Sequence, residues 1–133
     1  MEHAAHLHPF IVPLHPIVVH FPIAFYFLEL VLIVLWISKN DPSYQRFAAI
    51  AFYLGYAFML AAMAAGLFDA GGFGNIRGAV RRHVLAALAV FLIYTVRVVF
   101  YRRSSRGARL AGAAIGNLAV TYAGFLGGLV VYQ

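Results

Sequence analysis

Four long apolar stretches, separated by short polar breaks, constrain the fold of this chain more than any other feature of its sequence. They cover residues 14–38, 47–68, 79–101 and 110–132. A helix that crosses a bilayer needs roughly 20 apolar residues, and each stretch reaches that length. With 64% hydrophobic and 11% charged residues, the chain is also far more apolar than a soluble domain. The sequence therefore predicts an all-α integral membrane protein with four spans.

The breaks between the stretches predict how the spans are connected. They read "SKNDPSYQR", "DAGGFGNIRG" and "RRSSRGAR", which are rich in turn-forming and charged residues. Connections this short join antiparallel neighbours, and helices satisfy their own backbone groups in lipid. No repeat of about 20 to 50 residues is apparent. We therefore predict one domain, residues 1–133, folded as an up-and-down bundle of four transmembrane helices.

The positions of lysine and arginine predict the orientation of the bundle. The first and third connections carry Lys39, Arg46, Arg102, Arg103, Arg106 and Arg109, whereas the middle connection and the first turn of the third span carry Arg77, Arg81 and Arg82. Loops with more lysine and arginine usually face the cytoplasm, so both termini should lie outside it. The net charge of +6 then reflects topology and contact with anionic lipids, and does not indicate nucleic-acid binding.

All the histidines lie toward the side of the membrane that the bundle's outward end is expected to face. His3, His6 and His8 precede the first span and form a weakly metal-binding tail; His15 and His20 lie in its first turns, and His83 lies in the first turns of the third span. Ionisable residues at membrane depth are rare and usually face the bundle interior or a cavity. We therefore expect His20 and His83 to face one another, either as ligands or as hydrogen-bonded packing residues.

Two prolines decide whether His15 can join them. On an ideal helix the five-residue spacing places His15 and His20 about 140° apart. Pro16 suits the first helical position, which would leave His15 at or before the cap, and Pro22 deprives the carbonyl of Val18 of its donor and can bend the helix. His15 is accordingly either a further ligand or a residue of the membrane interface.

Small residues occur at the same depth on the second and fourth spans. The second span contains "AAMAAG" (61–66), and the fourth contains Gly124, Gly127 and Gly128. Such residues allow helices to pack closely, and they also leave room for a flat macrocycle. Asp69 ends the second span on the same side, where it can hydrogen-bond the second nitrogen of a ligand histidine or simply begin the loop.

Four motifs identify a family resemblance. "HPIVVHFPIA", "AAGLFDA", "RRHVLAALAVFLIY" and "GFLGGLVVY" occur in that order along the chain, which resembles the bacterial membrane family catalogued as domain of unknown function 2231. The resemblance implies a small four-span protein of the bacterial inner membrane, sometimes joined to or encoded near Rieske iron–sulfur and cytochrome components. It marks His15, His20, Asp69 and His83 and implies a redox module.

Three functions are compatible with these residues. The first is electron transfer by a b-type haem, with axial ligands from His20, His83 and His15 and with Arg81 and Arg82 placed for its propionates. The second is a copper, zinc or iron ion held by the three histidines and Asp69. The third is an accessory or assembly subunit of a larger respiratory membrane complex, in which the histidines only pack. The chain has no cysteine, which excludes thiolate ligands and covalently attached c-type haem.

A second polar layer is expected deeper in the membrane. Glu29, Arg97, Asn117 and Tyr94 lie at similar depths on three spans. A buried glutamate without a partner is costly, so we expect a Glu29–Arg97 pair supported by Asn117 and Tyr94, with a proton relay or a quinone head-group site as the functional alternative. No triad or phosphate-binding loop indicates catalysis by the chain on its own.

The remaining motif concerns assembly. Gly112 and Gly116 form a G-x-x-x-G sequence on the fourth span. This motif packs helices either within one bundle or between two copies in a homo-oligomer.

Overall fold

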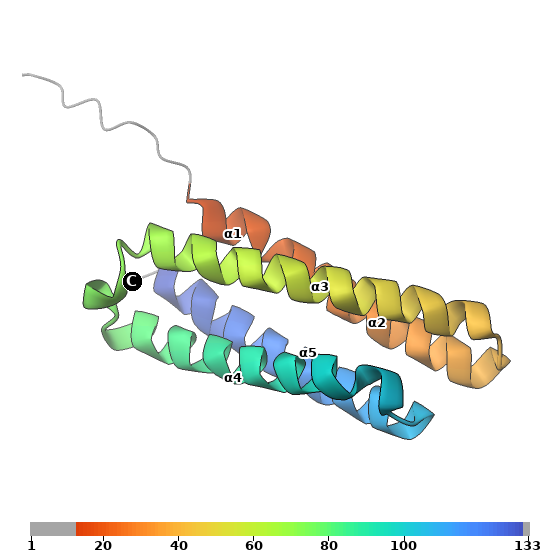
Figure 1. Cartoon of the computed structure of the whole chain (residues 1–133). Helices are drawn as coiled ribbons and strands as arrows, with labels where there is room; N and C mark the ends of the chain where they lie inside the picture. The colour runs from red at the N-terminus through yellow and green to blue at the C-terminus, as the bar shows by residue number, and fades with distance from the viewer. Residues whose placement is uncertain (1–12, 132–133) are drawn as a thin grey trace, which may run out of the picture.

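A computed structural model describes residues 13–131, which form long helices joined by short turns (Figure 1). The elements are α1 (Leu14–Val18), α2 (His20–Lys39), α3 (Pro42–Asp69), η1 (Phe73–Asn75), α4 (Gly78–Phe100), η2 (Tyr101–Arg103) and α5 (Arg106–Val131). Within the described residues, four helical segments are long and apolar enough to cross a membrane; they are Leu14–Lys39, Pro42–Asp69, Gly78–Arg103 and Arg106–Val130. The predicted all-α architecture with four spans is confirmed.

The helices extend past the apolar stretches into the polar breaks. Helix α3 already begins at Pro42, where the Asp41 carboxylate accepts a hydrogen bond of 2.8 Å from the backbone N–H of Ser43. Proline at the first helical position and aspartate at the cap both favour a helix start. The hydrogen bonds from Ser43 also hold the pKa of Asp41 below its ordinary value. Capping residues, which hydropathy does not register, therefore lengthen the helices.

The first span is interrupted at Val19, between α1 and α2. Pro22 explains the interruption, because it has no N–H to donate to the carbonyl of Val18. One expectation for this region is wrong: the helix begins at Leu14, so His15 lies inside the first turn of α1 and not at its cap. The reason is that Asp69 supplies the missing acceptor, since its Oδ2 lies 2.8 Å from the backbone nitrogen of His15.

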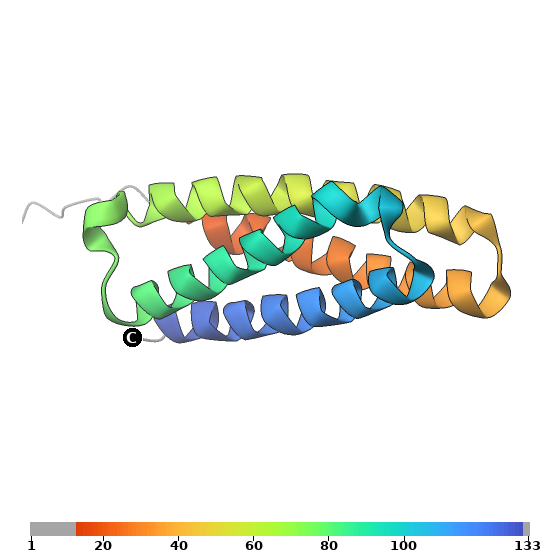
Figure 2. The same ribbon diagram turned by 60° about the horizontal axis from the view of Figure 1, so that its bottom comes forward.

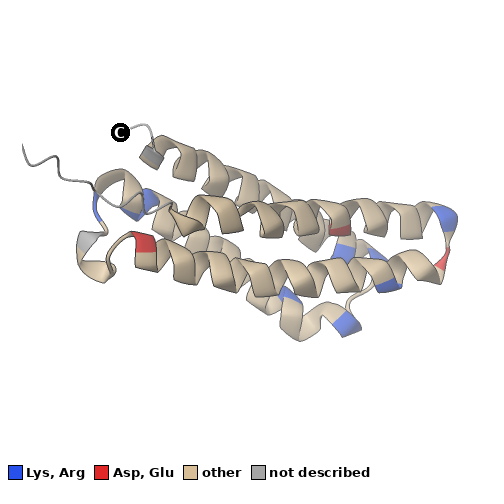
Figure 3. Cartoon of the chain, turned by 90° about the horizontal axis from the view of Figure 1, so that it is seen from above, with Lys and Arg blue, Asp and Glu red and all other residues tan. Residues whose placement is uncertain are grey.

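Two helical hairpins make up the bundle (Figures 1 and 2). In the first hairpin α1 and α2 pack along α3, and in the second α4 packs along α5, while contact between α2 and α5 joins the two hairpins. We call the end that contains α1 and the α3–α4 connection the histidine end, and the opposite end the arginine end. Charged residues are concentrated at the two ends of the bundle (Figure 3).

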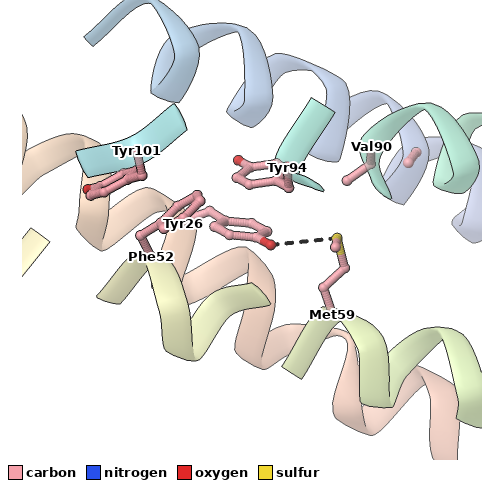
Figure 4. Close-up of a cluster of buried hydrophobic side chains, with 7 residues drawn as sticks. Tyr26, Phe52, Met59, Val90, Tyr94 and Tyr101 are labelled. Atoms are coloured by element: carbon pink, nitrogen blue, oxygen red, sulfur yellow. Dashed lines mark hydrogen bonds between the residues drawn. The ribbon is translucent and has the colours of Figure 1, made fainter. Parts of the chain in front are cut away.

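The bundle has an aromatic core, and many large apolar side chains are exposed on its outside. Tyr26, Phe52 and Tyr94 are fully buried, and Tyr26 and Phe52 each stack on Tyr94, with the ring centroids of Tyr26 and Tyr94 only 3.6 Å apart (Figure 4). By contrast, Leu118 is 72% exposed and Val99 is 67% exposed. A soluble protein would not leave so many large apolar side chains uncovered, and a lipid environment accommodates them.

Glycines make room for the large side chains of the core. A Cβ atom on Gly55 would lie 2.8 Å from Tyr26 Cε1, and one on Gly116 would lie 2.5 Å from Tyr94 Oη. A Cβ on Gly112 would lie 3.0 Å from Arg97 Nε. The G-x-x-x-G motif therefore packs inside this bundle, against side chains of α4.

We predict that Gly116→Ala destabilises the protein by about 1–3 kcal/mol, because the Tyr94 ring is stacked on Tyr26 and cannot move aside easily. Gly124→Ala on the same helix is the matched control, since nothing lies within 4 Å of a Cβ there. The unfolding midpoint in detergent would measure both variants. Equal midpoints for the two would contradict this account of the packing.

Candidate functional site

Two histidines from different hairpins meet at the histidine end. The rings of His15 on α1 and His83 on α4 have their centroids 5.7 Å apart, at an interplanar angle of 72°. Both side chains are partly buried. The structure thus brings together two imidazoles that are 68 residues apart in the chain, the separation that also divides Glu29 from Arg97.

Each imidazole is fixed by a backbone carbonyl of its own hairpin. His15 Nδ1 lies 2.7 Å from the carbonyl oxygen of Ala62, and His83 Nδ1 lies 2.9 Å from that of Ala123. A carbonyl oxygen can only accept a hydrogen bond, so Nδ1 of each ring carries the proton. In the neutral form of either ring, Nε2 is then the electron-pair donor. This is the arrangement in which histidine commonly binds metals, with the second nitrogen hydrogen-bonded to the protein.

A glycine lies one helical turn beyond each of these carbonyls. A Cβ on Gly66 would lie 2.9 Å from His15 Nδ1, and one on Gly127 would lie 3.0 Å from His83 Cε1. The absence of a side chain at these two positions therefore leaves room for the histidine rings. Gly124 and Gly128, the other small residues noted in the fourth span, face open space, since a Cβ on either would have no neighbouring atom within 4 Å.

The other predicted ligands lie elsewhere. His20 is exposed on the outside of α2 and does not face His83, which corrects the expected pairing. The spacing explains this: with His15 turned inward, a residue about 140° further round the helix points outward. Asp69 accepts the backbone N–H of His15 and so positions α1, and it does not hydrogen-bond either ring.

An apolar cavity of about 70 Å³ adjoins the two histidines. Its wall includes Tyr26, Met59 and Val120 together with His15 and His83. Within residues 13–131, no group of three or more histidine, cysteine, aspartate or glutamate side chains is placed to hold a metal ion. Arg81 and Arg82 are exposed in the first turn of α4. The histidine tail, His3, His6 and His8, lies outside the described residues.

The deeper polar layer contains the expected ion pair. Arg97 Nη2 and Nη1 donate to Glu29 Oε1 and Oε2 at 2.6 and 3.1 Å, and the Glu29 side chain is completely buried. The guanidinium also lies over the rings of Phe52 and Tyr94, at 4.7 and 5.0 Å from their centroids. The two carboxylate oxygens and the aromatic rings together stabilise the guanidinium charge, which the membrane interior cannot solvate.

Asn117 does not hydrogen-bond this pair, whereas Tyr94 contacts it. The Asn117 amide donates to the carbonyls of Tyr26 and Ala113, at 3.1 and 2.9 Å. Tyr94 does support the pair, because its ring lies 5.0 Å from the guanidinium carbon of Arg97. Asn117 therefore ties α5 to α2, and Tyr94 contributes its ring to the aromatic core.

The paired residues reveal an approximate two-fold relation between the hairpins. The pairs His15 with His83, Tyr26 with Tyr94, and Glu29 with Arg97 share one sequence separation, 68 residues. Each pair joins the first and third spans at a different depth, so the three contacts line up along the middle of the bundle. A ligand between the histidines would meet equivalent groups from both hairpins.

The second and fourth spans show the same correspondence between the two hairpins. Each of three small residues on α3 is separated from its counterpart on α5 by the same number of residues. The pairs are Gly55 with Gly116, Ala62 with Ala123, and Gly66 with Gly127. In each set the first glycine faces a tyrosine, the alanine carbonyl binds a histidine and the second glycine lies under that histidine. The repeated pattern G-x6-A-x3-G is present in the sequence, but its period is longer than that of the common structural repeats.

Comparison with known proteins agrees with this architecture. The family model described as predicted membrane protein (DUF2231) matches residues 11–133. The chain belongs to this family. No curated protein and no solved structure matches the chain. Membership of the DUF2231 family establishes a membrane protein in contact with the lipid bilayer, and it assigns no cofactor or reaction.

We predict that Glu29→Gln lowers stability by about 3–5 kcal/mol, because it leaves the Arg97 charge buried without a counter-charge. Adding Arg97→Gln to the same chain should restore most of the loss, since both charges are then absent. Thermal unfolding of the two variants in detergent would measure this. A double variant no more stable than Glu29→Gln would show that the pair is not what stabilises this layer.

Proposed function

We propose that this chain is a membrane electron-transfer module that holds a b-type haem between His15 and His83. The observation that carries the proposal is the paired imidazoles, which come from two hairpins and are fixed through Nδ1 with Nε2 left as a donor. Neutral imidazoles of this kind suit haem iron, and an apolar surrounding adjusts its reduction potential. When bound, haem supplies a one-electron couple.

The imidazole ligands suit haem iron, but the macrocycle needs more space between the hairpins than the histidine end has in this structure. Sites for small organic ligands enclose roughly 300–1,000 Å³, whereas the cavity beside the histidines has about 70 Å³. The two hairpins must therefore stand further apart at the histidine end to hold a macrocycle. Contacts between α3 and α4 are few, and the hairpins are joined mainly through α2 and α5.

The remaining residues of this end have defined roles in the proposal. Ala62 and Ala123 carbonyls keep each imidazole in one tautomer and orientation. Asp69 holds the start of α1, and with it His15, against the end of α3. Arg81 and Arg82, exposed beside His83 in the chain, are placed for carboxylate groups at the surface.

The small cavity favours a second candidate, a single transition-metal ion. Two imidazoles that bind one ion at about 2.0–2.1 Å require little space between them, and the 5.7 Å separation of the rings is close to that requirement. The ion would complete its coordination with water or a partner's group, because no third protein ligand is placed there among the described residues. Copper, zinc and iron are the ions that imidazole suits.

The orientation and partners of the module are part of the same proposal. Both termini lie outside the cytoplasm of a bacterial inner membrane, and the histidine end faces outward with them. Electrons would be exchanged with a Rieske or cytochrome partner, or with other subunits of a respiratory complex, as the family resemblance implies.

We predict that a reporter fused to Gln133 will be active when it is of the kind that requires the periplasm, and inactive when it requires the cytoplasm. The excess of lysine and arginine at the arginine end is the physical reason. Paired fusions of the two kinds, expressed at equal levels, would measure this. The opposite result would invert the orientation and place the histidines on the cytoplasmic side.

We predict that protein purified after expression with ample haem supply shows a Soret band and a reduced-minus-oxidised difference spectrum. His15→Ala and His83→Ala should each abolish or strongly shift the band, because each removes an axial ligand. His20→Ala is the matched control and should leave the band in place, since His20 is exposed on the outer side of α2.

The same samples distinguish the alternatives. A stoichiometric transition metal without a Soret band, lost in both His15→Ala and His83→Ala, would replace haem by the single-ion site. Neither haem nor metal in the wild-type protein would contradict the electron-transfer proposal and leave an accessory subunit with structural histidines. Equal loss of the cofactor in His20→Ala would show that the ligand pair is not the one proposed.

A further inference from the structure

A second cavity lies at the arginine end, on the opposite side of the bundle from the histidines. It has a volume of about 380 Å³ and lies between the start of α3 and the connection from α4 to α5. Its polar wall is formed by Gln45, Arg46, Tyr53, Tyr101, Arg102 and Arg109. Neither aspartate nor glutamate lines it, so among the described residues its wall contributes only positive charge and neutral donors.

Arg109 is the most buried cation of this wall. It is only 8% exposed, and its guanidinium lies 4.7 Å from the centroid of the Tyr101 ring and 5.4 Å from that of Trp36. Its Nε is buried and makes no hydrogen bond within the described residues. A buried donor without an acceptor costs free energy, so an anion that accepts a hydrogen bond from Arg109 would remove that cost.

The nearest acidic residues have other partners. Glu29 is held by both terminal nitrogens of Arg97, and the Asp41 carboxylate caps α3 through Ser43. Neither acid forms an ion pair with Arg46, Arg102 or Arg109 in the described part of the structure. Asp41 acts on Arg46, and Glu29 on Arg109, only at longer range than an ion pair, so the wall keeps an excess of positive charge for a ligand.

We propose that this cavity binds a phosphate-bearing anion, supplied either by the headgroup of an anionic lipid or by a soluble phosphate. Arginine guanidinium groups match phosphate oxygens in geometry and charge, and they are the preferred residues for this task. A volume of 380 Å³ is within the range of small-molecule sites. The cavity also lies at the ends of the spans, the level at which lipid headgroups surround a membrane protein.

The test uses the full-length purified protein and two separate probes. Native mass spectrometry with phosphatidylglycerol and phosphatidylcholine measures lipid binding, and titration with inorganic phosphate in neutral detergent measures the soluble ligand. We expect preference for phosphatidylglycerol, saturable binding of phosphate, or both, and the probe that binds identifies the source. Equal retention of the two lipids together with no phosphate binding would overturn the proposal.

Variants locate the binding in the cavity. Arg46→Gln and Arg102→Gln should each weaken binding by about tenfold, because each removes a charge-assisted hydrogen bond. Arg103→Gln is the matched control, since it removes the same charge from an exposed neighbour of Arg102 that does not line the cavity. Equal weakening in Arg102→Gln and Arg103→Gln would overturn the site in favour of general attraction to a positive surface. Both exposed arginines can be changed without disturbing the core, unlike Arg109.

Discussion

The ion pair between Glu29 and Arg97 is the interaction on which the rest of the bundle depends. It joins the two hairpins at a depth where no water can solvate either charge, so each group is stable there only because the other is present. Both oxygens and both terminal nitrogens are used, and the guanidinium is enclosed by aromatic rings. The register of the first span against the third is thereby fixed, and the tyrosine and histidine pairs follow from that register.

The same register explains why glycines recur on the second and fourth spans. In lipid there is little hydrophobic gain from bringing helices together, so close packing and internal hydrogen bonds must hold the bundle. Tyr26, Tyr94 and Arg97 are large side chains on the inner faces of the first and third spans, and each lies against a glycine of the neighbouring helix. Small and large residues are thus complementary across each hairpin, and the arrangement is repeated in both hairpins.

The two ends of the bundle differ in chemistry because they differ in which groups remain available. At the histidine end each ring is fixed by a carbonyl, which leaves one nitrogen of each ring able to donate an electron pair to a metal. At the arginine end the cations exceed the acids among the described residues, which leaves positive charge and the unpaired Nε of Arg109 beside a cavity. The first arrangement is the basis of the proposed haem or metal site and the second that of the proposed anion site, with the ion pair lying between them.

The sequence by itself determined the four spans, because the length and apolar character of each stretch leave a lipid-exposed chain no alternative to helices. It also determined the pairing of Glu29 with Arg97, since an unpaired buried charge is too costly. Only the tertiary structure decided that His15, and not His20, meets His83, because that choice depends on how α1 is held by Asp69 and broken before Pro22. The tertiary structure likewise decided that Asn117 donates to backbone carbonyls and that the two hairpins are related by an approximate two-fold axis. Both features depend on which helix faces which, and the hydropathy of a single chain does not specify how its helices face one another.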